Sequence, residues 1–310
     1  MNILVTGGAG FIGSHIVDFL LFKNYNVTVI DNLVTGKIEN ISHNLNNPNF
    51  TFIEKDIFDL EDILPHFKNI NVICHQAAWG SVPKSIKQPL DYNRNNITGF
   101  VNILECARIN NIKRVIYASS SSVYGDNKDS IKKEQNVGTI LSPYALTKHI
   151  DELFANLYFR LYNVETIGLR YFNIFGNRQN PEGDYAAVIP KFIKIISNNQ
   201  SPIINGDGTI SRDFTYVSNA VQANYLAIMT KNKKAFGRAF NVGCGDSITI
   251  NELAENVNTL LNKNISPTYG PSRQGDILYS KADICEIQNI LEYSPLINFK
   301  EGLNKLINNG

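Results

Sequence analysis

A tyrosine and a lysine four positions apart are the residues of this chain best suited to acid–base chemistry. Tyr144 and Lys148 lie in the segment Ser-Pro-Tyr-Ala-Leu-Thr-Lys, and on a helix two residues at this spacing project from the same face. A phenol is a weak base at neutral pH because its reference pKa is about 10, but an ammonium one turn away favours the phenolate. The pair is therefore a candidate base for an alcohol proton. The same spacing also occurs on ordinary solvated helix faces.

The glycine-rich segment near the start of the chain predicts a dinucleotide site. Gly7, Gly10 and Gly13 lie between an apolar run at 3–6 and a helical pattern at 11–22. Glycines at these positions let backbone N–H groups approach a pyrophosphate, and the helix N-terminus favours its negative charge. With this segment upstream, and the serine run 119–122 between, the tyrosine and lysine become a candidate active site.

An acidic residue ends the second predicted strand. Asp31 is placed to accept hydrogen bonds from an adenosine ribose diol, and its charge would repel a 2′-phosphate. We therefore expect NAD as the cofactor, in preference to NADP. Asp56 and Ile57, which follow the third predicted strand, could flank the adenine, and an exposed loop acid is an equal alternative for Asp56.

The order of apolar runs predicts the α/β fold class. The predicted strands are 3–6, 26–31, 51–55, 71–75, 114–119 and 164–171, and the predicted long helices are 11–22, about 89–110 and 143–162. Strands that alternate with helices indicate a Rossmann-type, doubly wound parallel sheet. After about residue 175, short strands and helices indicate a smaller mixed α/β lobe. We expect an NAD-binding domain over 1–175 and a substrate lobe over 176–310, with segments able to cross between them.

Composition limits the partners. The 310 residues carry a net charge of +1 without a basic stripe, so nucleic acid and acidic membrane surfaces are poor partners. The chain enters a strand at once, and we expect neither a signal peptide nor a membrane span. The four cysteines lie far apart, which favours reduced thiols and a cytoplasmic protein. The five histidines have no metal-ligand spacing, so no metal is expected.

Taken together, these motifs resemble the extended short-chain dehydrogenase/reductase family, and within it the UDP-glucose/UDP-N-acetylglucosamine 4-epimerases. The resemblance covers essentially the whole chain, and it rests on the glycine segment, Asp31, Asp56-Ile57, Ser120, Tyr144-x-x-x-Lys148 and Arg170-Tyr171-Phe172-Asn173. The stretches 76–83, 186–190, 204–208 and 211–214 are similar to the bacterial branch that prefers N-acetylated UDP-hexoses.

The resemblance implies inversion at C4 of a UDP-hexose through a transient 4-keto sugar, which rotates before the hydride returns. Tyr144 would take the proton of the 4-hydroxyl, Ser120 would hydrogen-bond the same oxygen, and Lys148 would bridge the nicotinamide ribose. The residues implied to bind NAD are Gly7, Gly10, Phe11, Ile12, Gly13, Asp31, Asn32, Asp56, Ile57, Ala77, Ala78, Asn96, Tyr144, Lys148 and Tyr171.

The resemblance also implies a UDP-sugar site. Its members would be Gly80, Ser81, Ser120, Ser121, Ser122, Asn173, Ala187, Val188, Asn205, Arg212, Arg273, Asp276 and Ser280. Arg212 and Arg273 would hold the diphosphate, because guanidinium forks match phosphate oxygens. Asp276 would meet the uridine ribose and Ala187-Val188 the uracil. Either arginine could instead form a surface salt bridge.

Small residues at the sugar end predict the substrate. The position of Ser280 often holds a large tyrosine in the family, and a smaller residue leaves room for a 2-acetamido group. With Gly80 and Ser81 also small, we expect UDP-GlcNAc and UDP-GalNAc as substrates, and slower turnover of UDP-Glc and UDP-Gal. Ser280 could instead be a surface serine. Ser121 and Ser122 occupy the places of the Asp-Glu pair of sugar 4,6-dehydratases, which argues against dehydration.

Two other functions stay open at this point. A UDP-hexuronic acid 4-epimerase or decarboxylase would need a cation near the C6 carboxylate, and the neutral Gly80/Ser81 region argues mildly against it. A non-catalytic NAD-sensing regulator commonly lacks the tyrosine or the lysine that this chain keeps. The resemblance also implies a homodimer that pairs helices 89–110 and 143–162, and a role in supplying precursors of surface polysaccharide. Trp79 either walls the cleft or packs in the core.

Overall fold

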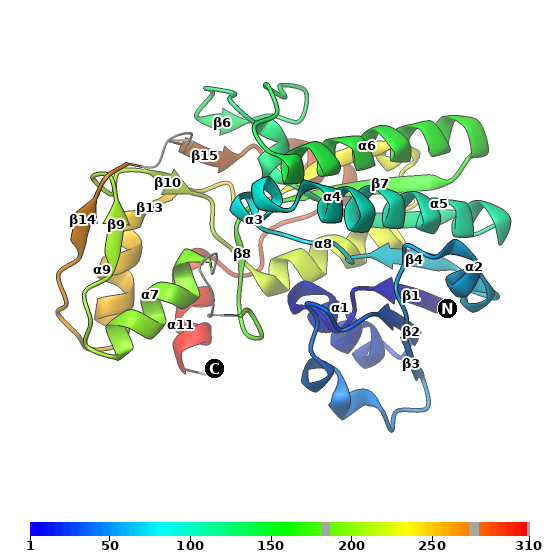
Figure 1. Ribbon diagram of the computed structural model, residues 1–310, viewed down its shortest axis with the longest axis horizontal. Helices are drawn as coiled ribbons and strands as arrows, with labels where there is room; N and C mark the ends of the chain where they lie inside the picture. Colours follow the sequence, from blue (N-terminus) through cyan, green and yellow to red (C-terminus); the bar gives the residue numbers. More distant parts are fainter. Residues whose placement is uncertain (181–186, 273–278, 309–310) are drawn as a thin grey trace.

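The computed structural model describes residues 1–180, 187–272 and 279–308, and it has a large lobe that carries the N-terminus and a smaller lobe that carries the C-terminus (Figure 1). A seven-stranded parallel sheet forms the large lobe, in the order β3-β2-β1-β4-β5-β7-β12. Its strands are β1 (Asn2–Thr6), β2 (Asn26–Asp31), β3 (Phe50–Glu54), β4 (Val72–His75), β5 (Arg114–Ser120), β7 (Glu165–Tyr171) and β12 (Arg238–Val242). The predicted fold class is confirmed.

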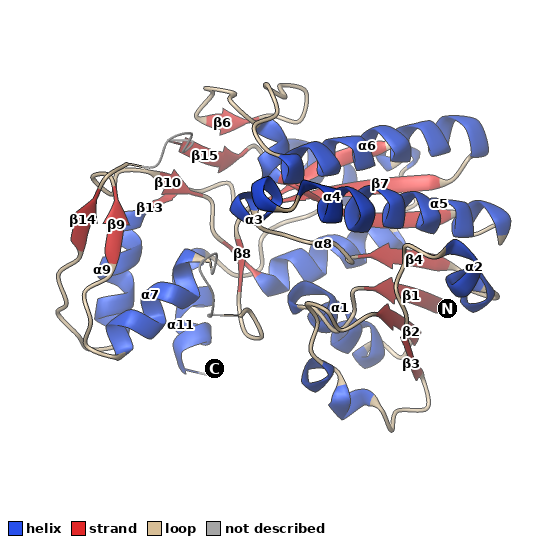
Figure 2. Ribbon diagram, in the orientation of Figure 1, coloured by secondary structure: helices blue, strands red, loops and turns tan. Residues whose placement is uncertain are grey.

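Helices cover both faces of this sheet (Figure 2). The helices are α1 (Phe11–Phe22), α8 (Val217–Met229) and α10 (Cys285–Leu291) on one face, and α5 (Gly99–Ile109) and α6 (Pro143–Tyr162) on the other. Leu4 and Val5 are neighbours in β1 but belong to two different buried clusters, one on each face. This double burial explains why the strands read as continuous apolar runs.

The predicted helices α1 and α6 have the bounds that the sequence indicated. At the start of α6, Ser142 accepts a hydrogen bond from the N–H of Ala145 (3.1 Å) and Pro143 takes the first helical position. Its end is marked by Asn163 in the left-handed conformation. The helix predicted over 89–110 is divided into α4 (Pro89–Tyr92), a π-helical turn (Asn93–Thr98) and α5.

The small lobe combines short strands with three helices. A four-stranded sheet has the order β13-β10-β15-β6, with β6 (Ile131–Lys132), β10 (Ser211–Arg212), β13 (Ile248–Thr249) and β15 (Tyr279–Ala282). The two-stranded pairs are β8 (Ile174–Phe175) with β11 (Thr215–Tyr216), and β9 (Ile203–Asn205) with β14 (Thr268–Gly270). Helices α7 (Val188–Ser197), α9 (Ile250–Leu260) and α11 (Phe299–Asn308) enclose an apolar core around Phe192, Phe214 and Phe299.

The remaining helices are short: α2 (Leu60–Ile63), α3 (Val82–Lys87) and 3-10 turns at Ile38–Asn40, Ser42–Asn44, Leu64–Phe67, Ser121–Tyr124 and Lys233–Ala235. In the described part of the chain, no helix combines the length and the apolar character that a membrane span requires.

Chain segments cross between the lobes in both directions. Strand β6 leaves the first 175 residues to join the small sheet, while β12 and α8 come from beyond residue 175 and join the large one. The two lobes are therefore tied together by the chain itself, and a site between them draws residues from both.

Candidate active site

A cavity of about 700 Å³ lies at the carboxyl ends of strands β1, β2, β4, β5 and β7 and extends to Arg212 and Ser280 of the small lobe. This is the edge at which open α/β sheets bind ligands. The predicted site residues that line it are Gly7, Gly10, Phe11, Ile12, Gly13, Asp31, Asn32, Asp56, Ile57, Ala77, Ala78, Gly80, Ser81, Ser120, Ser121, Ser122, Tyr144, Lys148, Tyr171, Asn173, Arg212 and Ser280.

The other predicted residues are not among the lining residues. Asn96 is buried behind the wall, where its Oδ1 accepts the N–H of Trp79 (2.8 Å) and its Nδ2 donates to Thr147 (3.0 Å); its neighbour Asn95 lines the cavity instead. Ala187, Val188 and Asn205 also do not line it, and Arg273 and Asp276 lie outside the described residues. The roles predicted for these residues stay predictions.

The glycine segment forms a cradle that side chains would fill. Gly7 has φ +68°, and a Cβ there would lie 2.6 Å from the backbone nitrogen of Ala77. A Cβ on Gly13 would overlap the carbonyl oxygen of Gly7. Among the described residues, no side chain caps the N-terminus of α1, so its first N–H groups have no acceptor from a capping side chain. The first helical residues, Phe11, Ile12 and Gly13, line the cavity. These features fit the pyrophosphate of a dinucleotide.

Asp31 is held at the end of β2 with both carboxylate oxygens engaged. Oδ2 accepts from the N–H of Ala9 (3.0 Å) and Oδ1 from that of Leu33 (2.9 Å). Burial raises the pKa of Asp31, and these two hydrogen bonds oppose that rise. Each oxygen has a second lone pair, so the carboxylate can still accept from a ribose diol. Asn32 donates to Asp56 (2.8 Å), which places Asp56 beside it on the wall.

The three predicted catalytic residues line the same cavity. Tyr144 and Lys148 come from the first two turns of α6, and Ser120 ends β5. The ring of Tyr144 meets Tyr92 edge-on, with 6.3 Å between centroids. Ser120 Oγ accepts the N–H of Ser122 (3.2 Å). This arrangement can place a base and a hydroxyl against one substrate oxygen.

One residue beside this group was missed by the sequence reasoning. Asp151 is 1% exposed, and its Oδ2 lies 3.2 Å from the Nζ of Lys148, which is 2% exposed. Burial raises the pKa of Asp151 to about 7, against the lowering effect of Lys148. The available signal was its spacing, three residues after Lys148 on a predicted helix. No cluster of three His, Cys, Asp or Glu among the described residues is arranged to hold a metal ion.

Tyr171 is fixed by a buried polar network. Its hydroxyl donates to Gln76 (3.0 Å) and accepts from the amide of Asn224 (2.7 Å). Burial raises its pKa, so the phenol stays protonated. Gln76 also lines the cavity; it begins the stretch 76–83 that carries the resemblance, but it is not among the predicted site residues.

The part of the cavity that the sequence analysis assigns to the sugar is lined by Trp79, Gly80, Ser81 and, from the small lobe, Arg212 and Ser280. Trp79 lines the cavity, so of its two interpretations, a wall of the cleft or a core residue, the first is correct. Its ring packs edge-on against Tyr92, with 5.9 Å between ring centroids, and the Nζ of Lys84 lies 4.4 Å from its ring centroid. Around Gly80, no atom of the described residues other than Gly80 and its two chain neighbours comes within 4 Å of the place that a Cβ would take. Ser280 is the register partner of Arg212 across β10 and β15, so the two side chains are neighbours on the cavity wall.

Comparisons with known proteins agree with this geometry. Residues 3–243 match the family described as "NAD dependent epimerase/dehydratase family". The chain is 40% identical over 308 residues to a protein of Methanocaldococcus jannaschii named "Putative UDP-glucose 4-epimerase", covering 99% of this chain and 97% of that one.

Two solved structures are similar over nearly their whole length. One is the UDP-N-acetylglucosamine 4-epimerase from Methanobrevibacter ruminantium M1 in complex with UDP-N-acetylmuramic acid, with TM-score 0.92, 43% identity, and coverage of 99% of this chain and 96% of that chain. The other is the UDP-glucose 4-epimerase of Thermus thermophilus in complex with NAD, with TM-score 0.87, 30% identity, and coverage of 99% of this chain and 98% of that chain.

Proposed function

Because this chain belongs to the NAD dependent epimerase/dehydratase family, we propose that it inverts C4 of UDP-hexoses, chiefly UDP-N-acetylglucosamine and UDP-N-acetylgalactosamine. It is an isomerase that uses NAD. The observation that carries the proposal is the meeting of Ser120, Tyr144 and Lys148 on the wall of one cavity with the glycine cradle.

The residues present fit NAD. The Gly7–Gly13 cradle and the N-terminus of α1 would hold its pyrophosphate, and Asp31 its adenosine ribose. When bound, NAD supplies the group that accepts hydride from C4 and returns it.

The chain's own groups handle the proton and the sugar. Tyr144 takes the proton of the 4-hydroxyl as the alcohol is oxidised and returns it as the ketone is reduced. Ser120 hydrogen-bonds the same oxygen, and Lys148 holds positive charge near the phenolate. Arg212 binds the diphosphate, about which the 4-keto sugar turns to present its other face.

The preference for N-acetylated sugars rests on the size of the wall residues. Ser280 is 8% exposed and lines the cavity beside Arg212, and Gly80 leaves open space where a side chain would stand. This space suits a 2-acetamido group. Pocket size alone discriminates by about 1–3 kcal/mol, so slower turnover of UDP-Glc and UDP-Gal is part of the proposal.

The competing functions have less support. For a UDP-hexuronic acid enzyme, a cation should meet the C6 carboxylate, whereas the lining residues Trp79, Gly80, Ser81 and Val82 are neutral. The cation beside Ser280, Arg212, is assigned to the diphosphate. A regulator without activity has no use for the Ser120, Tyr144 and Lys148 group.

The decisive experiment incubates the purified protein with UDP-GlcNAc, without added NAD, and follows UDP-GalNAc by proton NMR. We expect interconversion, and we expect Tyr144→Phe to reduce turnover by about 10²–10⁴-fold while UDP binding persists. Consumption of UDP-glucuronate in place of UDP-GlcNAc would favour the uronate enzyme. Inertness with every nucleotide sugar would favour the regulator.

We further propose a cytoplasmic homodimer that supplies precursors of surface polysaccharide. Support for the dimer comes from α6, where Leu146, Leu153, Leu157 and Leu161 are 47%, 59%, 42% and 61% exposed. Their spacing makes one apolar stripe along the outer face of the helix, as expected of a helix that packs against a partner. The assignment of residues 1–175 to NAD and 176–310 to the UDP-sugar is likewise a proposal.

A further inference from the structure

Three polar side chains of α6 form a stripe that leads from the cavity into the core. Tyr144, Lys148 and Asp151 are spaced i, i+4 and i+7, so they share one helix face. Tyr144 is partly exposed on the cavity wall, Lys148 is 2% exposed behind it, and Asp151 is 1% exposed at the inner end. The contact between Lys148 Nζ and Asp151 Oδ2 is 3.2 Å.

A charged lysine at this depth requires an opposite charge, because burial disfavours an unpaired ammonium. His75 of β4 also faces Lys148, but an imidazole is either neutral or positive and so cannot supply a negative charge. Burial together with the charge of Lys148 lowers the pKa of His75 to about 3, so it stays neutral, with its Nδ1 2.7 Å from Thr6 Oγ1. Glu152, the next carboxylate of α6, is bound by Arg170. Asp151 is thus the carboxylate that contacts Lys148 among the described residues.

We propose that Asp151 is a positioning residue for Lys148, which holds the ammonium in place and sets the pH range over which Tyr144 can act as a base. The inference rests on the proposed epimerase function. Asp151 is not among the residues that line the cavity, so it acts through Lys148.

The charged surroundings of Asp151 are few. Lys148 and Glu152 act on it from its own helix, and it acts on Tyr117 of β5. Arg170 of β7 reaches this group through Glu152, and His75 of β4 faces Lys148. One oxygen, Oδ1, has no hydrogen-bond partner among the described residues. Because burial raises the pKa of Asp151 to about 7, its charge changes near neutral pH.

The direction of the effect follows from electrostatics. A negative charge at Asp151 favours the protonated forms of both Tyr144 and Lys148. Without that charge, both the phenol of Tyr144 and the ammonium of Lys148 should lose their protons at lower pH than in the wild type. Both limbs of a bell-shaped activity profile should therefore move toward acid, and the limb set by Lys148, whose Nζ lies 3.2 Å from Asp151, should move farther than the limb set by Tyr144. Tyr144 and Asp151 are seven residues apart, about 10 Å along the helix, and at that distance the limb set by Tyr144 should shift by about one pH unit.

The test compares pH profiles of kcat/KM for the holoenzyme, using UDP-GlcNAc. We expect Asp151→Asn to move both limbs to lower pH, and Asp151→Glu, which keeps the charge, to return them toward the wild-type position. Glu255→Gln removes an exposed charge from α9 and should leave the profile unchanged. Superimposed profiles for wild type and Asp151→Asn would overturn the inference, whatever the change in kcat.

Two further measurements test the inference even if Asp151→Asn does not fold. Asp151→Ala leaves no buried amide without a partner, and it decides the question if Asp151→Asn does not fold. In the wild type, carbon-13 NMR of labelled aspartate carboxyls should show one group whose titration midpoint moves in Lys148→Met; no such group would overturn the inference. If the wild type itself lacks epimerase activity, the proposed function fails, and the NMR result still reports whether Asp151 and Lys148 are coupled.

Discussion

Arg170 binds Glu152 through two parallel hydrogen bonds, from Nε to Oε1 and from Nη2 to Oε2, each 2.8 Å long. The two side chains are only 7% and 10% exposed. Ser119 Oγ donates to the same Oε1 at 2.6 Å, so the pair joins β7, α6 and the end of β5. Since Ser120 follows directly, this junction fixes the place from which the Ser120 hydroxyl projects.

We expect Glu152→Gln to be strongly destabilising. The change leaves the Arg170 guanidinium buried without its counter-charge, which costs about 3–5 kcal/mol of unfolding free energy. The matched control is Glu286→Gln, because Glu286 pairs with Arg238 at the surface, where both side chains are at least 40% exposed, and such pairs contribute about 1 kcal/mol or less. Urea unfolding monitored by circular dichroism measures both. Equal losses in the two variants would contradict the importance of the buried pair.

Ser280→Tyr should change the substrate preference. A phenol ring beside Arg212 would fill the space assigned to the acetamido group, so kcat/KM for UDP-GlcNAc should fall by about 10–200-fold relative to that for UDP-Glc. Ser280→Ala, which keeps the side chain small, should leave the ratio near that of the wild type. If the ratio is the same in Ser280→Tyr, the serine does not gate the pocket.

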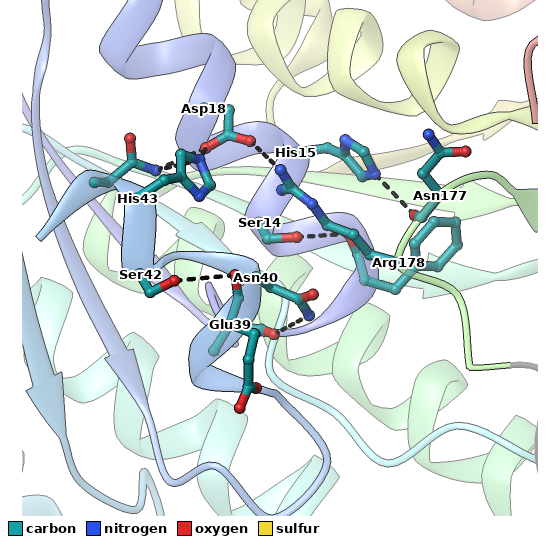
Figure 3. Close-up of polar contacts among 12 residues, drawn as sticks. Ser14, His15, Asp18, Glu39, Asn40, Ser42, His43, Asn177 and Arg178 are labelled. Carbon is teal, nitrogen blue, oxygen red and sulfur yellow. Dashed lines mark hydrogen bonds and ion pairs between the residues drawn. The ribbon is translucent and has the colours of Figure 1, made fainter. Parts of the chain in front are cut away.

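Asp18 is a shared acceptor that fastens two loops to α1 (Figure 3). Its Oδ2 accepts from Arg178 (2.7 Å), and its Oδ1 contacts His43 Nε2 (2.8 Å) and accepts from Asn44 (2.7 Å). Gln179, next to Arg178, lines the cavity. We expect Asp18→Asn to lower the unfolding free energy by about 1.5–3 kcal/mol through the lost charged hydrogen bonds, and to weaken NAD retention.

Retained NAD can be measured by absorbance after gel filtration and denaturation. The control is His43→Gln, since the His43 side chain is 50% exposed and should contribute little. NAD retention that is unchanged in Asp18→Asn would mean that the loops keep their positions without this carboxylate.

His75 should make the protein sensitive to acid. Burial lowers the pKa of His75 from an ordinary 6.5 to about 3. Between these two pH values, the imidazole of His75 is protonated in the unfolded chain and neutral in the folded chain. Stability from this source is present above pH 6.5 and is lost as the pH falls, by about 1.4 kcal/mol per pH unit.

The variant His75→Asn should remove that dependence while an amide still reaches Thr6. Urea unfolding at about pH 6.5, 5.5 and 4.5, values that lie within the interval between the two pKa values, measures the difference between wild type and variant. We expect the difference in unfolding free energy between wild type and variant to change steadily across the series. If the unfolding free energies of the two proteins depend on pH in the same way, the pKa of His75 is not lowered in the folded state.

The exposed stripe of α6 gives a test of the dimer. Leu153→Glu combined with Leu161→Glu places charges on the surface that a partner helix would cover, and we expect a monomer in analytical ultracentrifugation. Glu39→Gln, an exposed change far from this helix, is the control. A wild-type protein that already sediments as a monomer would reject the dimer.

Local signals made part of the fold predictable. The Ser142-Pro143 start and the glycine segment before Phe11 each have a direct backbone consequence, and the helices that they begin have the predicted bounds. The cavity residues at the strand ends were predictable for the same reason, because in a parallel sheet the carboxyl ends share one edge.

Other features depend on contacts between distant residues, and the sequence carried no local mark of them. The π-helical turn Asn93–Thr98 turns Asn96 inward to hold Trp79, and leaves Asn95 on the cavity wall. Asp151 has the appearance of a surface acid in the sequence, and its burial appears only when α6 packs on the sheet. Strand β12 is as long as β1 and β3, but the sequence analysis did not predict it, and its place in the large sheet is defined by its pairing with β7.

That late strand has a consequence for how the protein is made. Residues 238–242 cover the free border of β7, so a nascent chain that has emerged only as far as residue 175 exposes a row of unsatisfied peptide groups there. Synthesis must therefore proceed past residue 242 before β12 can pair with β7 and complete the large sheet. Truncation after residue 175 should accordingly yield a sticky, aggregation-prone fragment, and not an autonomous nucleotide-binding module.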